Sequence, residues 1–109
     1  MQRIEYAPAA QALATSSTPA TITVRPGLTV MSLLSTLVNV SGGNVTAISV
    51  ARTLDGTTYG AERSITSGLP LAAGAALDVD IIDEPAIAYR FTITAASAGS
   101  VSLTSRGVV

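Results

Sequence analysis

Residues 89–95 read Tyr-Arg-Phe-Thr-Ile-Thr-Ala, and this stretch decides the class of the fold. Its large apolar side chains recur at every second position, with an arginine and two threonines between them. Strict alternation of this kind places one set of side chains on each face of a β-strand. We therefore predict a central strand over Ala88–Ala95, with Tyr89, Phe91 and Ile93 packed in the core.

The same period of two appears on both sides of this strand. Leu77, Val79 and Ile81 alternate with Asp78 and Asp80, and further alternating runs lie at residues 21–25, 44–54 and 101–104. Glycine, proline and Asn/Asp signals separate the runs, at the spacing of about 8–12 residues that is typical of a β-sandwich. We predict an all-β fold: a single β-sandwich of about seven or eight strands. The spacing leaves open whether its topology is immunoglobulin-like or a jelly roll.

Residues 28–40 carry apolar side chains at both odd and even positions. This pattern suits a strand that is buried on both faces or one that contains a bulge. A helix over Val30–Leu37 is the competing interpretation, because periodicity alone does not separate the two. The Ser41-Gly42-Gly43-Asn44 sequence that follows predicts a hairpin.

The strand predicted over Asn44–Leu54 has Ile48, Val50 and Leu54 on one face. It ends at Asp55-Gly56, which predicts a turn in which Gly56 supplies a positive φ angle.

Residues 1–19 differ from residues 20–109, which form the predicted sandwich domain. Two prolines and a Ser/Thr cluster interrupt the N-terminal segment, so we predict an extended arm. A short helix at Ala9–Ala14 and a frayed terminus are the alternatives. If the arm becomes ordered on contact with a partner, its anchors are expected to be Ile4, Tyr6 and Leu13.

The composition excludes several classes of function. Only 12% of the residues are charged, about half the usual share, and the net charge is −1, so we expect no nucleic-acid binding. Without cysteine or histidine the chain lacks thiolates, the commonest general base and the commonest metal ligand. We expect no enzyme activity, cofactor or small-molecule substrate. No run of residues is long and apolar enough for a membrane span, and the N-terminus has no apolar signal core.

One acidic group could in principle bind a cation. Asp78, Asp80, Asp83 and Glu84 are close in sequence, and several carboxylate oxygens together are what Ca²⁺ requires. The simpler interpretation, which we favour, is a solvated strand face followed by a turn. On the face opposite Phe91, Arg90 is expected to pair with Asp78 or Asp80, or to lie in an interface.

The segment from Arg52 to Tyr59, which reads Arg-Thr-Leu-Asp-Gly-Thr-Thr-Tyr, resembles a hairpin pattern of small bacteriophage structural proteins. The elements that follow it there have counterparts here in Leu71-Ala72-Ala73-Gly74 and Tyr89-Arg90-Phe91-Thr92-Ile93, so the resemblance covers residues 44–104. It implies a β-sandwich of the virion, made in the bacterial host cytoplasm, with no catalytic residue.

From this resemblance we expect a capsid decoration (cement) protein that binds the major capsid protein through apolar and β-edge contacts. It is expected to form a homo-oligomer, because few charges keep its surfaces apart. A tail-associated structural protein is the first alternative. The second is a small carbohydrate- or cell-surface-binding sandwich, although the chain has no tryptophan and only three tyrosines.

Overall fold

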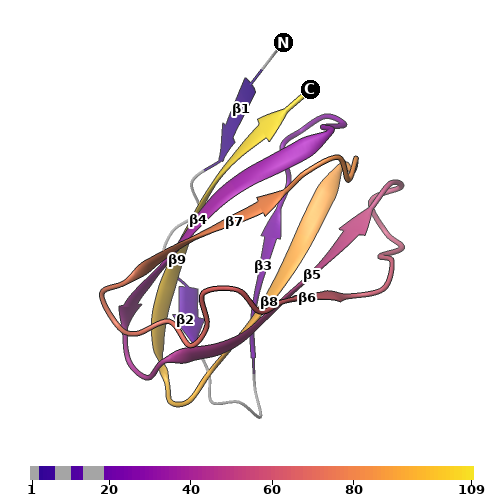
Figure 1. The fold of residues 1–109 in the computed structure, drawn as a ribbon. Helices are drawn as coiled ribbons and strands as arrows, with labels where there is room; N and C mark the ends of the chain where they lie inside the picture. Colours follow the sequence, from indigo (N-terminus) through magenta and orange to yellow (C-terminus); the bar gives the residue numbers. More distant parts are fainter. Residues whose placement is uncertain (1–2, 7–10, 14–18) are drawn as a thin grey trace.

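The computed structural model describes residues 3–6, 11–13 and 19–109, with side chains from residue 19 onward. In this part of the chain the fold is all-β, without helices, and two antiparallel sheets pack face to face as a single β-sandwich (Figure 1). The first sheet contains β1 (Arg3–Tyr6), β2 (Gln11–Leu13), β9 (Gly99–Val108), β4 (Ser32–Ser41) and β7 (Ala76–Ile81). The second contains β3 (Ala20–Val24), β8 (Ala88–Ala95), β5 (Val45–Thr53) and β6 (Arg63–Ile65).

The strand order is that of a jelly roll. β1 and β2 both pair with β9, so together they occupy the edge position of the first sheet, which runs β1/β2-β9-β4-β7. The second sheet runs β3-β8-β5-β6. The chain therefore pairs with itself from the outside inward, β1/β2 with β9, β3 with β8, β4 with β7 and β5 with β6, like a long hairpin wound into two sheets. This order decides between the two topologies that the sequence left open.

The core lies between the sheets, and β8 provides its largest side chains. Tyr89, Phe91 and Ile93 are at most 1% exposed, and β8 is a central strand between β3 and β5. The predicted strand, its central position and its buried face are confirmed. Burial of these side chains contributes about 1.5–3 kcal/mol each to stability, before entropic costs.

Strand β4 differs from two of the three structures that the sequence pattern allowed for residues 28–40. Leu33, Ser35, Leu37 and Asn39 are buried, while Leu34 is 38% exposed on the outer face. Neither burial on both faces nor a helix over Val30–Leu37 is therefore correct. The predicted bulge is confirmed, because the register with β9 shifts between Asn39 and Ser41.

Residues 41–44 do form a tight turn, with Gly42 at φ 99°, but the predicted hairpin is wrong. β4 belongs to the first sheet and β5 to the second, so the turn carries the chain across the core. The turn between β8 and β9 does the same, and the two turns lie next to each other at one end of the sandwich (Figure 1). Pairing continues around this corner, from Ser41–Ser100 in one sheet to Val45–Ala95 in the other.

The N-terminal segment is extended where it is described. β1 and β2 pair with β9 in the first sheet, so Gln11–Leu13 is a strand and the helix alternative does not hold there. The rest of Ala9–Ala14 and the side chains of Ile4, Tyr6 and Leu13 lie outside the described residues. Their role as anchors stays a prediction.

Candidate interaction surface

The four acidic residues considered for Ca²⁺ do not form a ligand group. Asp78 accepts a hydrogen bond from Thr36 Oγ1 (2.9 Å), and Asp80 accepts one from the Ser35 N–H (3.4 Å). In the following loop, the Asp83 N–H donates to Ser32 Oγ (3.0 Å). Within the part of the chain that the structure describes, no three acidic side chains come together as a cation site would require.

Glu84, the fourth member, forms an ion pair with Arg63 of β6.

Arg90 does not pair with Asp78 or Asp80, contrary to that expectation. β8 lies in the second sheet and β7 in the first, so Arg90 and the two aspartates point out from opposite sides of the sandwich. The Arg90 guanidinium instead stacks on the Tyr59 ring, 4.3 Å from its centre. This cation–π contact holds the loop between β5 and β6 against the second sheet.

The turn at Asp55-Gly56 is confirmed, with Gly56 at φ 90° and a bridge between Thr53 and Tyr59. Asp55 Oδ1 accepts hydrogen bonds from the N–H groups of Thr58 (2.8 Å) and Thr57 (2.9 Å) and from Thr53 Oγ1 (2.9 Å). These bonds hold the pKa of Asp55 well below its usual range. Asp55 is thus a fixed anion that shapes a loop and is unsuited to proton transfer.

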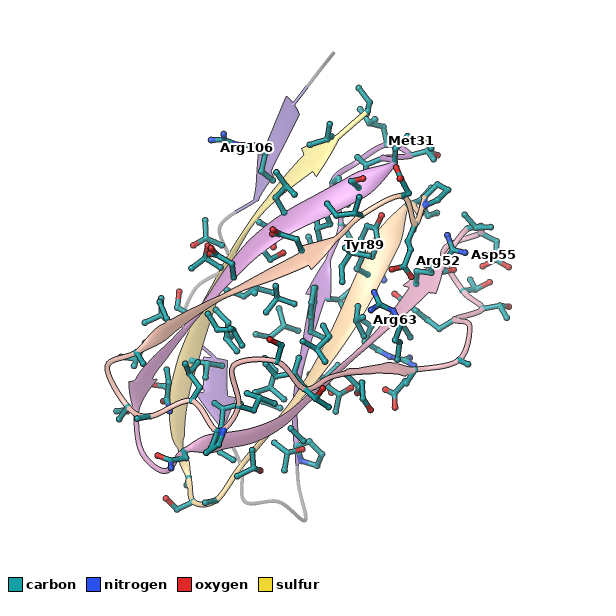
Figure 2. All side chains as sticks on the ribbon, in the orientation of Figure 1. Met31, Arg52, Asp55, Arg63, Tyr89 and Arg106 are labelled. Carbon is teal, nitrogen blue, oxygen red and sulfur yellow. The ribbon has the colours of Figure 1, made fainter. Side chains whose placement is uncertain are left out.

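The most distinctive surface feature is an apolar end of the sandwich. Of the six large hydrophobic side chains that are exposed among the described residues, four lie in three loops at the end that carries the C terminus: residues 25–31, 54–62 and 82–87 (Figure 1). We call these four residues the apolar end: Leu28 (40% exposed), Met31 (50%), Leu54 (65%) and Ile82 (55%). Figure 2 shows Met31 and Asp55 near this end of the molecule.

The sequence pattern predicts Leu54 on the same strand face as Ile48 and Val50, which are buried. Leu54 is exposed because β5 ends at Thr53 and the turn begins there.

Backbone hydrogen bonds tie these loops to one another. Val30 and Ala86 exchange two such bonds, each 3.0 Å long, which join the first and third loops. The Ile87 N–H donates to the Thr53 carbonyl (3.0 Å), which joins the third loop to the end of β5. The loops therefore present their apolar side chains from a fixed backbone, so little ordering would be needed on binding.

Sequence reasoning did not single out the apolar end. Three of its four residues lie beside turn-forming positions: Leu28 follows Pro26-Gly27, Leu54 precedes Asp55-Gly56 and Ile82 precedes Asp83. A large aliphatic residue next to a turn signal was the available clue, because a turn is normally at the surface.

No family model, curated protein or solved structure matches this chain. A search of the described residues for a helix long and apolar enough to cross a membrane found none.

Proposed function

We propose that this chain is a structural protein that docks onto a larger protein assembly through its apolar end. The main support is that four large aliphatic side chains are exposed on three loops at one end of the sandwich, and that backbone hydrogen bonds connect these loops. Single exposed hydrophobic residues are common, but a group of them at one end of a domain marks an interaction site. Burying them would release about 25 cal/mol for each Å² of apolar surface.

The assembly we propose is a bacteriophage virion, with the capsid surface as the docking partner of a decoration protein. Two observations support this choice. The first is the resemblance of residues 44–104 to small phage structural proteins, and the second is the jelly-roll order of strands. Jelly rolls are frequent in viral capsid proteins, but lectin domains and cupins have them too. The fold is therefore compatible with a virion role and does not select it over these other classes.

The aromatic rings of the described residues give less support for sugar binding than the apolar end gives for protein docking. Tyr89 and Phe91 are buried, and Arg90 covers one face of the Tyr59 ring. Of the described rings, only that of Tyr59 is partly exposed, and Arg90 occupies one of the two faces on which a sugar could stack.

The test of this proposal is whether the chain is part of a particle. Phage particles produced by cells that carry the gene would be purified on a density gradient and analysed by quantitative mass spectrometry. We expect the chain in the particle band at a fixed ratio to the major capsid protein. Recovery only in the soluble fractions would contradict the proposal, and recovery with isolated tails would move the docking site from the capsid to the tail.

A further inference from the structure

The β7 edge of the first sheet is not paired by any residue that the structure describes. β7 pairs only with β4, and no backbone hydrogen bond from any other described residue reaches Ala76–Ile81. An unpaired strand edge presents a row of N–H and C=O groups that can accept a further strand. The start of the edge is partly covered, because Gly68 lies against the Leu77 side chain, so the accessible part is Asp78–Ile81.

A cavity lies beside this edge. β6 has only three residues, and the space between it and β7 forms a hollow of about 310 Å³. Its apolar lining is Ile65, Leu77 and Val79, and its polar lining is Arg63, Ser64, Thr66, Ser67, Asp78 and Asp80. A strand added beside β7 would run about 4.8 Å from it. Every second side chain of that strand would point the same way as Val79, into the hollow. Aliphatic side chains at those positions would cover the half-buried side chains of Ile65 and Leu77.

The alternate side chains of an added strand would lie beside Asp78 and Asp80 on the outer face. Both aspartates are exposed, and neither forms an ion pair with a described residue. Directly opposite side chains in adjacent strands are about 5 Å apart, so basic residues there would be favoured. A second copy is disfavoured, because antiparallel β7–β7 pairing about a twofold axis would bring like charges together.

We infer that the β7 edge binds an extended segment of another protein by strand addition, and that the segment alternates aliphatic with basic residues. The aliphatic side chains fill the hollow between β6 and β7, and the basic ones pair with Asp78 and Asp80. The site is separate from the apolar end and does not depend on whether the chain belongs to a virion. The same backbone-plus-pocket recognition is used by domains that bind peptides at a sheet edge.

The experiment is an NMR titration of the ¹⁵N-labelled full chain with blocked hexapeptides. The probes are (Lys-Val)₃, (Glu-Val)₃ and (Lys-Ser)₃. We expect (Lys-Val)₃ to shift the amide signals of residues 77–81, and both other peptides to bind at least tenfold more weakly. Equal binding of (Glu-Val)₃, or shifts centred on β3 or β6, would overturn the inference.

Paired variants separate the role of the aspartates from that of net charge. Asp78→Asn with Asp80→Asn raises the net charge by two, and so does Thr21→Lys with Thr57→Lys, at exposed positions in β3 and in the loop between β5 and β6. The first pair should weaken (Lys-Val)₃ binding at least tenfold, and the second should leave it within about twofold. Equal losses would contradict a specific site. A concentration-dependent dimer of the free chain with shifts at 77–81 would show that a second copy is the occupant.

Discussion

Gly99 lies so close to Ser41 that a Cβ added to the glycine would overlap the Ser41 carbonyl oxygen. Ser41 is the last residue of β4 and Gly99 the first of β9, so both adjoin the turns that cross between the sheets. Gly42 and Gly43 approach Ala98 and Ser97 in the same way. The corner of the jelly roll therefore depends on three glycines that let two backbones stack.

Gly99→Ala should destabilise the domain by about 3 kcal/mol or more, because the obstacle is backbone that cannot rotate away. Gly60→Ala is the matched control, since the nearest atom to its added Cβ is 3.8 Å away. It should change stability by less than about 1 kcal/mol. Urea denaturation of both variants measures the difference, and equal midpoints would contradict the packing described for the corner.

The hydroxyl groups of Ser35 and Ser105 form a buried hydrogen bond of 2.9 Å between β4 and β9. Either single Ser→Ala change leaves one buried hydroxyl without its partner, at a cost of about 1–3 kcal/mol. The double change to alanine should cost less than the sum of the two single changes. A double-mutant cycle measures this coupling, and additive losses would show that the bond does not contribute.

Phe91→Ala should cost about 3–5 kcal/mol, from lost transfer energy and the cavity left between the sheets. Thr92 is on the outer face, where its hydroxyl donates to Glu62 Oε1 (3.1 Å), so Thr92→Ala should cost under about 1 kcal/mol. Thermal or urea melts compare the two. A larger loss for Thr92→Ala would mean that the register of β8 is shifted by one residue.

The domain should lose stability at high pH through Tyr89. Burial raises its pKa to about 12, with Arg52 opposing and Glu84 adding to the shift, and its hydroxyl donates to the Glu84 carbonyl (2.6 Å). The folded chain thus favours the neutral phenol. The stability that Tyr89 contributes through this pKa shift is complete below about pH 10, the pKa of an unfolded tyrosine. It is lost as the pH rises through about 12.

Tyr89→Phe should flatten the decline of the melting temperature between pH 10 and 12, at a cost of about 1 kcal/mol at neutral pH for the lost hydrogen bond. An unchanged slope in the variant would assign the alkaline loss to other groups.

The sequence predicted the sandwich well because strands such as β7 and β8 alternate cleanly. It was least informative for β4, where the outward-facing Leu34 is apolar and the inward-facing Ser35 and Asn39 are polar. Asn39 is buried because its side-chain amide donates to the carbonyls of Gly43 and Leu71, both 3.0 Å away, a long-range requirement that no local pattern displays.

Two other features could not be predicted from local sequence patterns. A glycine-rich turn has the same composition whether it joins strands of one sheet or of two. The pattern at residues 41–44 therefore predicts a hairpin even though β4 and β5 belong to different sheets. β6 has only three residues within a stretch that reads as a loop, so it was not predicted. The four residues of the apolar end come together because the strand order places their three loops at the same end of the sandwich, and the strand order is not visible in a local pattern.

If the apolar end docks the chain onto a particle, a charged side chain placed there should remove the chain from the particle. The direct measurement is the amount of chain on purified particles after Met31→Lys or Ile82→Lys, compared with Val40→Lys. Val40 is similarly exposed, at 48%, but lies at the opposite end of the sandwich. Melting temperatures should change little in all three, because these are surface positions. Docking through the apolar end predicts at least tenfold less chain on particles for Met31→Lys and Ile82→Lys, with occupancy close to normal for Val40→Lys. Normal occupancy of the first two variants, or an equal loss for Val40→Lys, would contradict it.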